Sequence, residues 1–342
     1  MTSLKRWIKR MVGGLLALVA AAIMIGAGYE AKMRRQAAAD HPAPGRLVDI
    51  GGRKIQIDCR GSGSPIVVLE AGLDMNGSLA WAKVHDSIAV TTRTCGYSRA
   101  GVMWSDDNPG QQSAVMIATD LKAALVAAGE NPPYVMVGHS LGGPYIMTFT
   151  KLHEADVAGL VFVDASHPEQ VQRFKSVLGR QLEPPIGMMR AAAKLAWAGV
   201  VRVAMSAAGG AGADPVARTT AAYAPTSLGP MLEELDAMDS TMAQAGSFRR
   251  LGKRPLVVLT AMAPTDPNQL KMMKMSQEES VRFKAAWKAM HDEEATWSTQ
   301  SEHILVPDAT HYIQHDRPDI VIAAVRKVVG LVRNPVPAPQ VH

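Results

Sequence analysis

The sequence is poor in cysteine and lacks the patterns that hold metals or phosphates. Only two cysteines, Cys59 and Cys95, occur among 342 residues, and neither stands at metal-ligand spacing from a histidine. No convincing phosphate-binding glycine loop and no internal repeat is present. These absences lead us to expect neither a metal ion nor an organic cofactor.

Basic charge is concentrated at the N-terminus. Residues 1–40 contain seven Lys or Arg and two acidic residues, a surplus that equals the net charge of the whole chain, +5. Residues 41–342 are therefore neutral overall. A neutral body argues against nucleic acid as a partner.

An uncharged and almost wholly apolar segment lies within this basic region. Met11–Tyr29 has nineteen residues, which as a helix would span roughly 28 Å, close to the hydrocarbon thickness of a bilayer. Trp7 and Tyr29 stand near its ends, where aromatic rings favour the membrane interface. We predict that residues 1–40 form a signal anchor with a transmembrane helix. The slight excess of basic residues before the span favours a catalytic domain outside the cytoplasm.

The alternative is a cleaved signal peptide. Ala37-Ala38-Ala39 offers a small-residue cleavage site. Cleavage there would leave a secreted or periplasmic protein without an anchor.

Residues 41–342 alternate between short apolar strands and amphipathic helices. This alternation predicts an α/β domain with a mainly parallel, eight-stranded sheet covered by helices on both faces. Residues 165–250 interrupt the rhythm between the sixth and seventh strands and predict a helical cap or lid. The expected strands are 46–50, 53–59, 66–70, 91–97, 134–138, 157–164, 255–260 and 304–306, and the expected helices are 81–89, 112–128, 144–152 and 319–332.

The most informative motif is Gly138-His139-Ser140-Leu141-Gly142, between an apolar strand and a helical pattern. It has the form of the G-x-S-x-G nucleophile elbow. Glycines are needed there because a Cβ atom would collide across so sharp a turn. The motif predicts Ser140 as a catalytic nucleophile, with the free N–H groups of the following helix directed toward it.

From about Gly45 to Val332 the chain resembles the α/β-hydrolase superfamily, particularly bacterial membrane-anchored or exported serine hydrolases. The resemblance is strong for the fold and weak for the substrate, since one fold hosts many reactions. Ser98 stands where many relatives carry Asp. The matching segments are Pro44–Asp49, Val68–Gly72, Tyr97–Gly101, Val137–Gly143, Leu160–Pro168 and His311–Gln314.

The resemblance implies a histidine in the loop after the last strand, where it would accept the proton of the serine. His311 fits this position. His315, four residues on, is the competing candidate and lies closer to the final helix.

Two aspartates compete for the third position of the triad. Asp164 ends the sixth strand, and some superfamily lipases and dehalogenases place their acid there. Asp266 follows the seventh strand, the commoner superfamily position, among prolines that also suit a plain turn. We favour Asp164, because sites in open α/β sheets gather at the carboxyl ends of strands.

An oxyanion hole needs two backbone donors. One is expected to be the N–H of Leu141, directly after the nucleophile. The resemblance implies Leu73, in the loop after the third strand, as the other. It also makes the strands of Cys59 and Cys95 neighbours, so a disulfide between them is plausible if the domain lies outside the cytoplasm.

These features together predict a serine hydrolase that cleaves a small, apolar carboxylic ester through an acyl-enzyme on Ser140. The alternatives with the same triad are a C–C bond hydrolase and a cofactor-free perhydrolase. A non-catalytic binding protein of the same fold is the remaining hypothesis. A serine at the elbow argues against epoxide-hydrolase and haloalkane-dehalogenase chemistry, which needs a carboxylate there.

Overall fold

The computed structural model describes residues 2–108, 110, 112–182, 186–207, 212 and 214–335. The chain divides into two compact units. Unit 1 comprises Met1–Ala43 and Ile186–Gly229, and unit 2 comprises Pro44–Pro185 and Pro230–His342.

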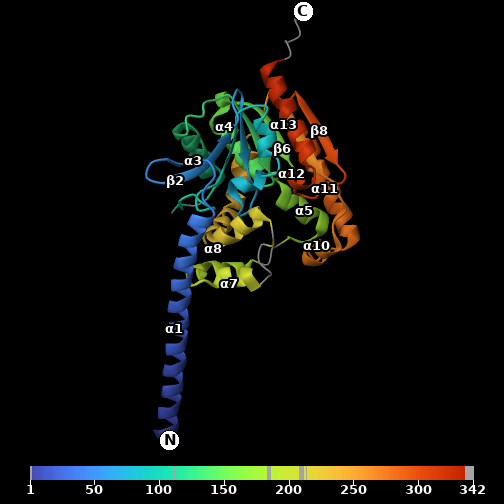
Figure 1. Ribbon diagram of the computed structural model, residues 1–342. Helices are drawn as coiled ribbons and strands as arrows, with labels where there is room; N and C mark the ends of the chain where they lie inside the picture. The colour runs from blue at the N-terminus through green and yellow to red at the C-terminus, as the bar shows by residue number, and fades with distance from the viewer. Residues whose placement is uncertain are drawn as a thin grey trace, which may run out of the picture. The chain divides into compact units, whose positions relative to one another are not determined.

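Unit 2 is built on an eight-stranded sheet in the order β1-β2-β4-β3-β5-β6-β7-β8. Figure 1 labels β2, β6 and β8 of this sheet. The first two pairings, β1 with β2 and β2 with β4, are antiparallel, and all the others are parallel. The predicted mainly parallel sheet is therefore confirmed. The strands are β1 (Arg46–Asp49), β2 (Lys54–Arg60), β3 (Ile66–Glu70), β4 (Thr94–Tyr97), β5 (Tyr134–His139), β6 (Val157–Val163), β7 (Leu256–Ala261) and β8 (Ser301–Val306).

Helices cover both faces of the sheet, as a parallel sheet requires. On one face α3 (Ala114–Ala127) and α4 (Gly142–Leu152) enclose a core with β5 and β6. On the other face α2 (His85–Ala89) and α13 (Pro318–Arg333) enclose a second core. Every residue of β3 and β5 is buried, which explains their continuous runs of apolar residues.

The remaining helices include those of the predicted cap. The single helix expected at 81–89 is instead a 3-10 turn, η1 (Gly77–Trp81), followed by α2, because Val84 has a non-helical φ of −121°. The other elements are η2 (Glu154–Asp156), α5 (Gln170–Leu178), α6 (Gly187–Lys194), η3 (Ala196–Ala198), α7 (Val200–Ala207), α8 (Pro215–Asp236), α9 (Met238–Gly246), α10 (Pro267–Met272), α11 (Gln277–Ala295) and α12 (Ile313–Asp316).

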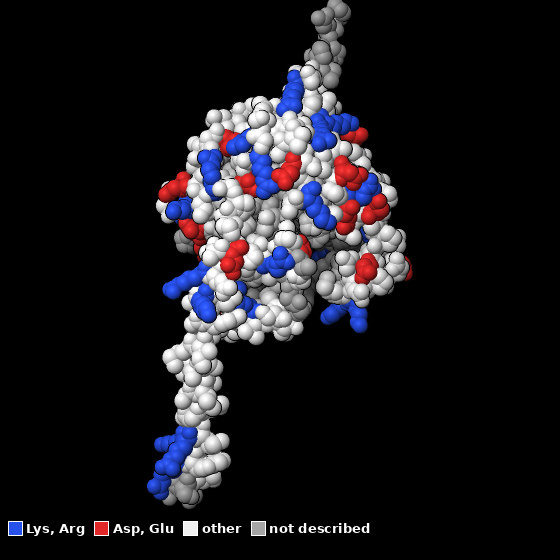
Figure 2. Space-filling model, viewed as in Figure 1, with Lys and Arg blue, Asp and Glu red and all other residues white. Residues whose placement is uncertain are grey.

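Unit 1 is organised around one long helix, α1 (Thr2–Asp40). By length and composition α1 can cross a membrane, and none of its most apolar stretch is buried. Figure 2 shows basic side chains gathered near the free end of α1 and an uncharged surface along its middle.

The C-terminal part of α1 packs against η3 and α7 within the same unit. A Cβ atom added to Gly26 would lie 2.3 Å from the carbonyl oxygen of Ala198, so the two backbones touch. Glu30, 1% exposed, accepts two hydrogen bonds from Arg202, at 2.8 and 3.1 Å. Residues 187–207, predicted only as part of a cap, thus belong to the same compact unit as α1.

Cys59 of β2 lies directly opposite Cys95 of β4 in the antiparallel register. The two sulfurs are bonded at 2.07 Å and close a loop with a sequence separation of 36 residues. The disulfide joins the antiparallel edge of the sheet to its parallel centre.

We expect removal of this disulfide to destabilise the protein, because the crosslink restricts the unfolded chain. A loop of this length is worth about 2–4 kcal/mol. The Cys59→Ala/Cys95→Ala variant should lose that amount in urea unfolding of the full chain in mild detergent. Reductant should destabilise the wild type and leave the variant unchanged. Equal urea midpoints for oxidised and reduced wild type would contradict the prediction.

Candidate active site

Ser140 lies in the sharp turn between β5 and α4. Its φ is +52°, in the left-handed region that non-glycine residues seldom adopt. The Ser140 carbonyl oxygen accepts hydrogen bonds from the N–H groups of Gly143 (3.0 Å) and Ser166 (2.8 Å). These bonds hold the strained turn and fix the direction of the hydroxyl.

Three glycines allow the backbone to pack this closely around Ser140. A Cβ atom at Gly138 would lie 2.6 Å from the carbonyl oxygen of Gly142, and one at Gly142 would lie 2.6 Å from that of Glu70. A Cβ at Gly72 would lie 2.9 Å from the Cβ of Ser140. All three distances are shorter than van der Waals contact, so any larger residue would displace the turn.

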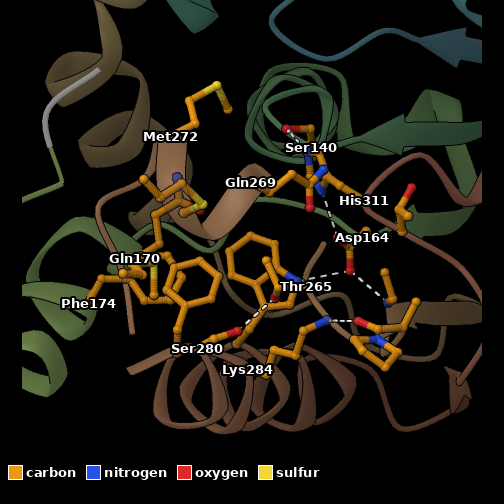
Figure 3. A pocket seen from close by; sticks show the side chains of 18 of the residues that line it. Ser140, Asp164, Gln170, Phe174, Thr265, Gln269, Met272, Ser280, Lys284 and His311 are labelled. Atoms are coloured by element: carbon orange, nitrogen blue, oxygen red, sulfur yellow. Dashed lines mark hydrogen bonds and ion pairs between the residues drawn. The ribbon is translucent and has the colours of Figure 1, made fainter. Parts of the chain in front are cut away.

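The structure brings Ser140, His311 and Asp164 together. His311 Nε2 lies 2.9 Å from Ser140 Oγ, and His311 Nδ1 lies 2.6 Å from Asp164 Oδ2. His311 follows β8 in a short loop, and Asp164 follows β6 directly with a φ of +45°. Figure 3 shows the three residues in a row along one side of a cavity.

Asp164 is buried and receives two further hydrogen bonds on its other oxygen, Oδ1. These come from the backbone N–H of Ala261 (2.8 Å) and from Trp287 Nε1 (2.9 Å). Burial alone would raise the pKa of Asp164, but the hydrogen bond and charge of His311 outweigh it and leave the pKa below its ordinary value. The carboxylate is therefore held ionised, and both of its oxygens are held in place.

The two competing candidates lie elsewhere. Asp266 is exposed at the N-terminus of α10, where its carboxylate accepts from the backbone N–H of Asn268 at 2.7 Å. It serves there as a helix cap. His315 faces the carbonyl oxygen of Ala80, at 3.1 Å from its Nε2.

Both expected oxyanion donors border the turn. Leu141 is the N-cap of α4, and Leu73 follows Gly72 in the loop after β3. Among the described residues, neither backbone N–H makes a hydrogen bond. Such free donors near a helix N-terminus can stabilise a developing negative charge.

A buried arginine holds the loop that carries Leu73. Arg99, 4% exposed, donates to the carbonyl oxygens of Ala71 (2.9 Å) and Gly72 (2.6 Å). Its charge is balanced by Glu70, at 2.8 Å, and by Glu234 of α8, at 2.7 and 2.8 Å. The loop is thus fixed by charge-assisted bonds from the interior.

His139, beside Ser140 in sequence, is buried and is not among the described residues that line the cavity. Its Nε2 lies 2.9 Å from the carbonyl oxygen of His311, so it supports the loop that presents His311. Burial, reinforced by the charge of His311, lowers the pKa of His139 to about 3. His139 is therefore neutral and donates through Nε2.

A cavity of about 380 Å³ opens beside Ser140 and His311. Across from them lie Gln170 and Phe174 (Figure 3). Phe174 stacks on Phe283 and Trp287, with ring centroids 4.1 and 5.6 Å away.

Half-buried Lys284, which also lines the cavity, donates a hydrogen bond to the carbonyl oxygen of Ala263, and burial lowers the pKa of its amine. Much of the remaining lining is apolar, with Ala261, Pro264, Met272, Met273 and Met275.

Among the described residues, no group of three or more His, Cys, Asp or Glu side chains at this cavity has the spacing of a metal site. In the part of the chain that the structure describes, the one grouping that resembles a ligand set is Cys59, Cys95 and Glu130. Both sulfurs are bonded to each other, and Glu130 pairs with Arg93 at 2.6 Å. This grouping therefore does not suit a metal ion.

Sequence reasoning missed three side chains that support the site: Trp287, Glu234 and Arg99. Trp287 lies 123 residues from the aspartate to which it donates, so no local pattern indicates the contact. Arg99 belongs to the segment Tyr97–Gly101, which carried part of the resemblance. Its place in that segment is the one sequence signal that could have indicated a role at the site.

The fold and this site define the class of protein. The Alpha/beta hydrolase family matches residues 57–324, and the chain belongs to that family. The relative named "Probable transporter efuK", from Hormonema carpetanum, is 37% identical over 128 residues. That stretch covers 35% of this chain and only 18% of the relative.

Solved structures share the fold at low identity. A thermophilic esterase from Thermogutta terrifontis has a TM-score of 0.55 and 17% identity, covering 84% of this chain and 97% of its own. The enol-lactonase from Burkholderia xenovorans LB400 has a TM-score of 0.57 and 15% identity, covering 83% of this chain and 100% of its own. At these identities the likeness shows the fold alone.

The buried neutral His139 predicts a measurable loss of stability in acid. Below its ordinary pKa of 6.5 the unfolded chain binds a proton at this residue, whereas the folded chain does not until about pH 3. The free energy of unfolding therefore falls as the pH falls through this range, by about 2 kcal/mol between pH 7 and 5.

The His139→Gln variant should lack this contribution. We expect guanidinium unfolding at pH 7 and pH 5 to show an acid-induced loss that is smaller for the variant by about 2 kcal/mol. The same loss in wild type and variant would show that His139 titrates normally in the folded protein.

Proposed function

We propose that this chain is a serine hydrolase that cleaves carboxylic esters through an acyl-enzyme on Ser140. The observation that carries the proposal is the pair of distances at His311, 2.9 Å to Ser140 Oγ and 2.6 Å to Asp164 Oδ2. A serine hydroxyl becomes nucleophilic when a correctly oriented imidazole accepts its proton.

In the first half-reaction His311 Nε2 accepts the proton of Ser140 as Oγ bonds to the ester carbonyl carbon. The electron pair of the carbonyl moves to its oxygen, which receives hydrogen bonds from the N–H groups of Leu73 and Leu141. Asp164 holds Nδ1–H of His311 and stabilises the imidazolium. The C–O bond to the alcohol then breaks, and His311 returns the proton to the leaving oxygen.

In the second half-reaction water replaces the alcohol. His311 accepts a proton from the water as its oxygen attacks the acyl carbon. The bond to Ser140 Oγ breaks, the serine recovers its proton from His311, and the carboxylic acid leaves. No metal or organic cofactor takes part in this scheme.

The shape of the cavity favours a small, apolar ester as substrate. Its volume of about 380 Å³ is at the lower end of ligand sites, and stacked Phe174, Phe283 and Trp287 provide a flat apolar wall. Three methionines, Met272, Met273 and Met275, add flexible apolar surface that adapts to different acyl groups.

We also propose that α1 anchors the protein in a membrane, with the hydrolase unit outside the cytoplasm. The length, apolar composition and exposure of α1 support this placement. The disulfide between Cys59 and Cys95 supports an oxidising compartment, since disulfides persist outside the cytosol. Cleavage after residues 37–39 would instead release a soluble form.

The Ser140→Ala variant tests the proposal directly. It should lose labelling by a fluorophosphonate probe and lose hydrolysis of p-nitrophenyl acetate and butyrate by at least about 10³-fold. Ser176→Ala, which removes an exposed hydroxyl on α5, is the matched control and should keep both. A wild-type protein that the probe does not label would indicate a binding protein of the same fold. Wild-type turnover of vinylogous diketones or formation of peracids, without ester hydrolysis, would favour the other chemistries of this triad.

The Asp164→Asn and Asp266→Asn pair tests the identity of the acid. Asparagine at 164 cannot accept the hydrogen bond of the His311 Nδ1–H as an ionised carboxylate does. Ester turnover should therefore fall by about 10³–10⁴-fold. Asparagine at 266 still caps α10 and should change turnover by less than about twofold. The reverse ranking of the two variants would assign the acid to Asp266.

A further inference from the structure

A group of large apolar side chains in unit 1 faces outward. It lies on α6, η3 and α7, within the 16 residues 188–203. The exposed fraction is 84% for Met188, 52% for Trp197 and 62% for Val203. The surfaces of soluble proteins seldom carry so many large apolar side chains close together. The interfacial patch, as we call it, consists of Met188, Met189, Leu195, Trp197, Val200 and Val203.

The patch is fixed beside α1 by contacts within unit 1. The backbone of Ala198 touches Gly26, and a Cβ added to Gly199 would lie 3.7 Å from Cδ1 of Tyr29. One turn further along α1, the buried pair of Glu30 and Arg202 ties α7 to α1. The patch therefore cannot take an arbitrary position along α1.

The level of these contacts along α1 coincides with the predicted edge of the bilayer. Gly26 precedes Tyr29, the last residue of the apolar segment, by three residues, or about 4.5 Å of helix. Amphipathic helices that lie on membranes bury their apolar side roughly 5–10 Å below the headgroups. Figure 1 shows α7 running sideways from α1 rather than along it, as a helix lying in the membrane plane would.

The charges around the patch suit the same location. Lys32 and Arg35 follow Tyr29 on α1, and Lys194 ends α6; all three are exposed. Long basic side chains at this level can reach phosphate groups while their neighbours contact acyl chains. Trp197 has the amphipathic ring that is enriched at membrane interfaces.

We propose that the interfacial patch lies in the headgroup region of the bilayer that α1 crosses, and that its ligand is the phospholipid surface. This inference rests on the proposed membrane span and goes beyond it. A lone transmembrane helix leaves the remainder of the chain free to tumble about its attachment. A second, lateral contact would fix the orientation of unit 1 against the membrane.

The test uses spin labels on the full chain in nanodiscs of phosphatidylethanolamine and phosphatidylglycerol. Both native cysteines are in the disulfide, so one introduced cysteine can be labelled selectively without reductant. Three exposed positions are compared: Val203→Cys in the patch, Leu16→Cys in the apolar segment of α1, and Val126→Cys on α3 as the control in water. Accessibility is measured with oxygen, which enters lipid, and with a nickel chelate, which does not. Circular dichroism checks the fold of each variant.

We expect the label at 203 to be at least roughly threefold less accessible to the nickel chelate than the label at 126, while remaining accessible to oxygen. Its calculated depth should be shallower than that of the label at 16. Equal nickel accessibility at 203 and 126, with a lipid signal at 16, would overturn the patch proposal and leave the anchor intact. A water-exposed label at 16 would overturn both. Protection of 203 from nickel and oxygen alike would show that protein, such as a second copy, covers the patch. None of these outcomes depends on esterase activity, which the fluorophosphonate experiment tests separately.

Discussion

The close approach of three backbone segments around Ser140 is the constraint on which the site depends. A non-glycine residue at a φ of +52° costs about 1–3 kcal/mol, so surrounding contacts must hold it. Gly72, Gly138 and Gly142 permit those contacts because none carries a Cβ atom. The same turn directs the hydroxyl toward His311 and leaves the N–H of Leu141 free. One local geometry thereby supports two of the proposed roles, the nucleophile at Ser140 and one donor of the oxyanion hole at Leu141.

The loop that carries Leu73, the other proposed oxyanion donor, depends on a buried network of charges. Arg99 connects Glu70 at the end of β3, Glu234 of α8 and two carbonyl oxygens of the loop before Leu73. Burial raises the pKa of Glu70 to about 7, even though Arg99 favours its ionised form. Ion pairs so deeply buried add little net stability, because desolvation offsets their attraction. Their effect here is positional: a guanidinium with five fixed donors holds the loop at one distance from Ser140.

Sequence patterns were sufficient for the individual strands and the elbow, because both are local. Apolar runs between turn residues located every strand, and the glycines of residues 138–142 indicated the turn. The choice between Asp164 and Asp266 was not local. Both follow strands that adjoin in the sheet, and only the three-dimensional direction of each side chain separates a carboxylate that contacts His311 from one that caps α10. Two further features depend on packing, which periodicity does not encode. They are the interruption of the helix after Trp81 and the inclusion of residues 187–207 in the same unit as α1.

Trp287 links the proposed chemistry to the proposed specificity. Its indole N–H donates to Asp164 Oδ1, while its ring stacks with Phe174 and Phe283 in the wall of the cavity. A substitution that reshapes the wall at Trp287 therefore also removes a donor from the carboxylate that orients His311. Phe174 and Phe283 carry no polar group, so changes there alter the cavity without touching the acid. Divergence in substrate preference should consequently be easier at positions 174 and 283 than at 287, because only the last position has two functions to satisfy.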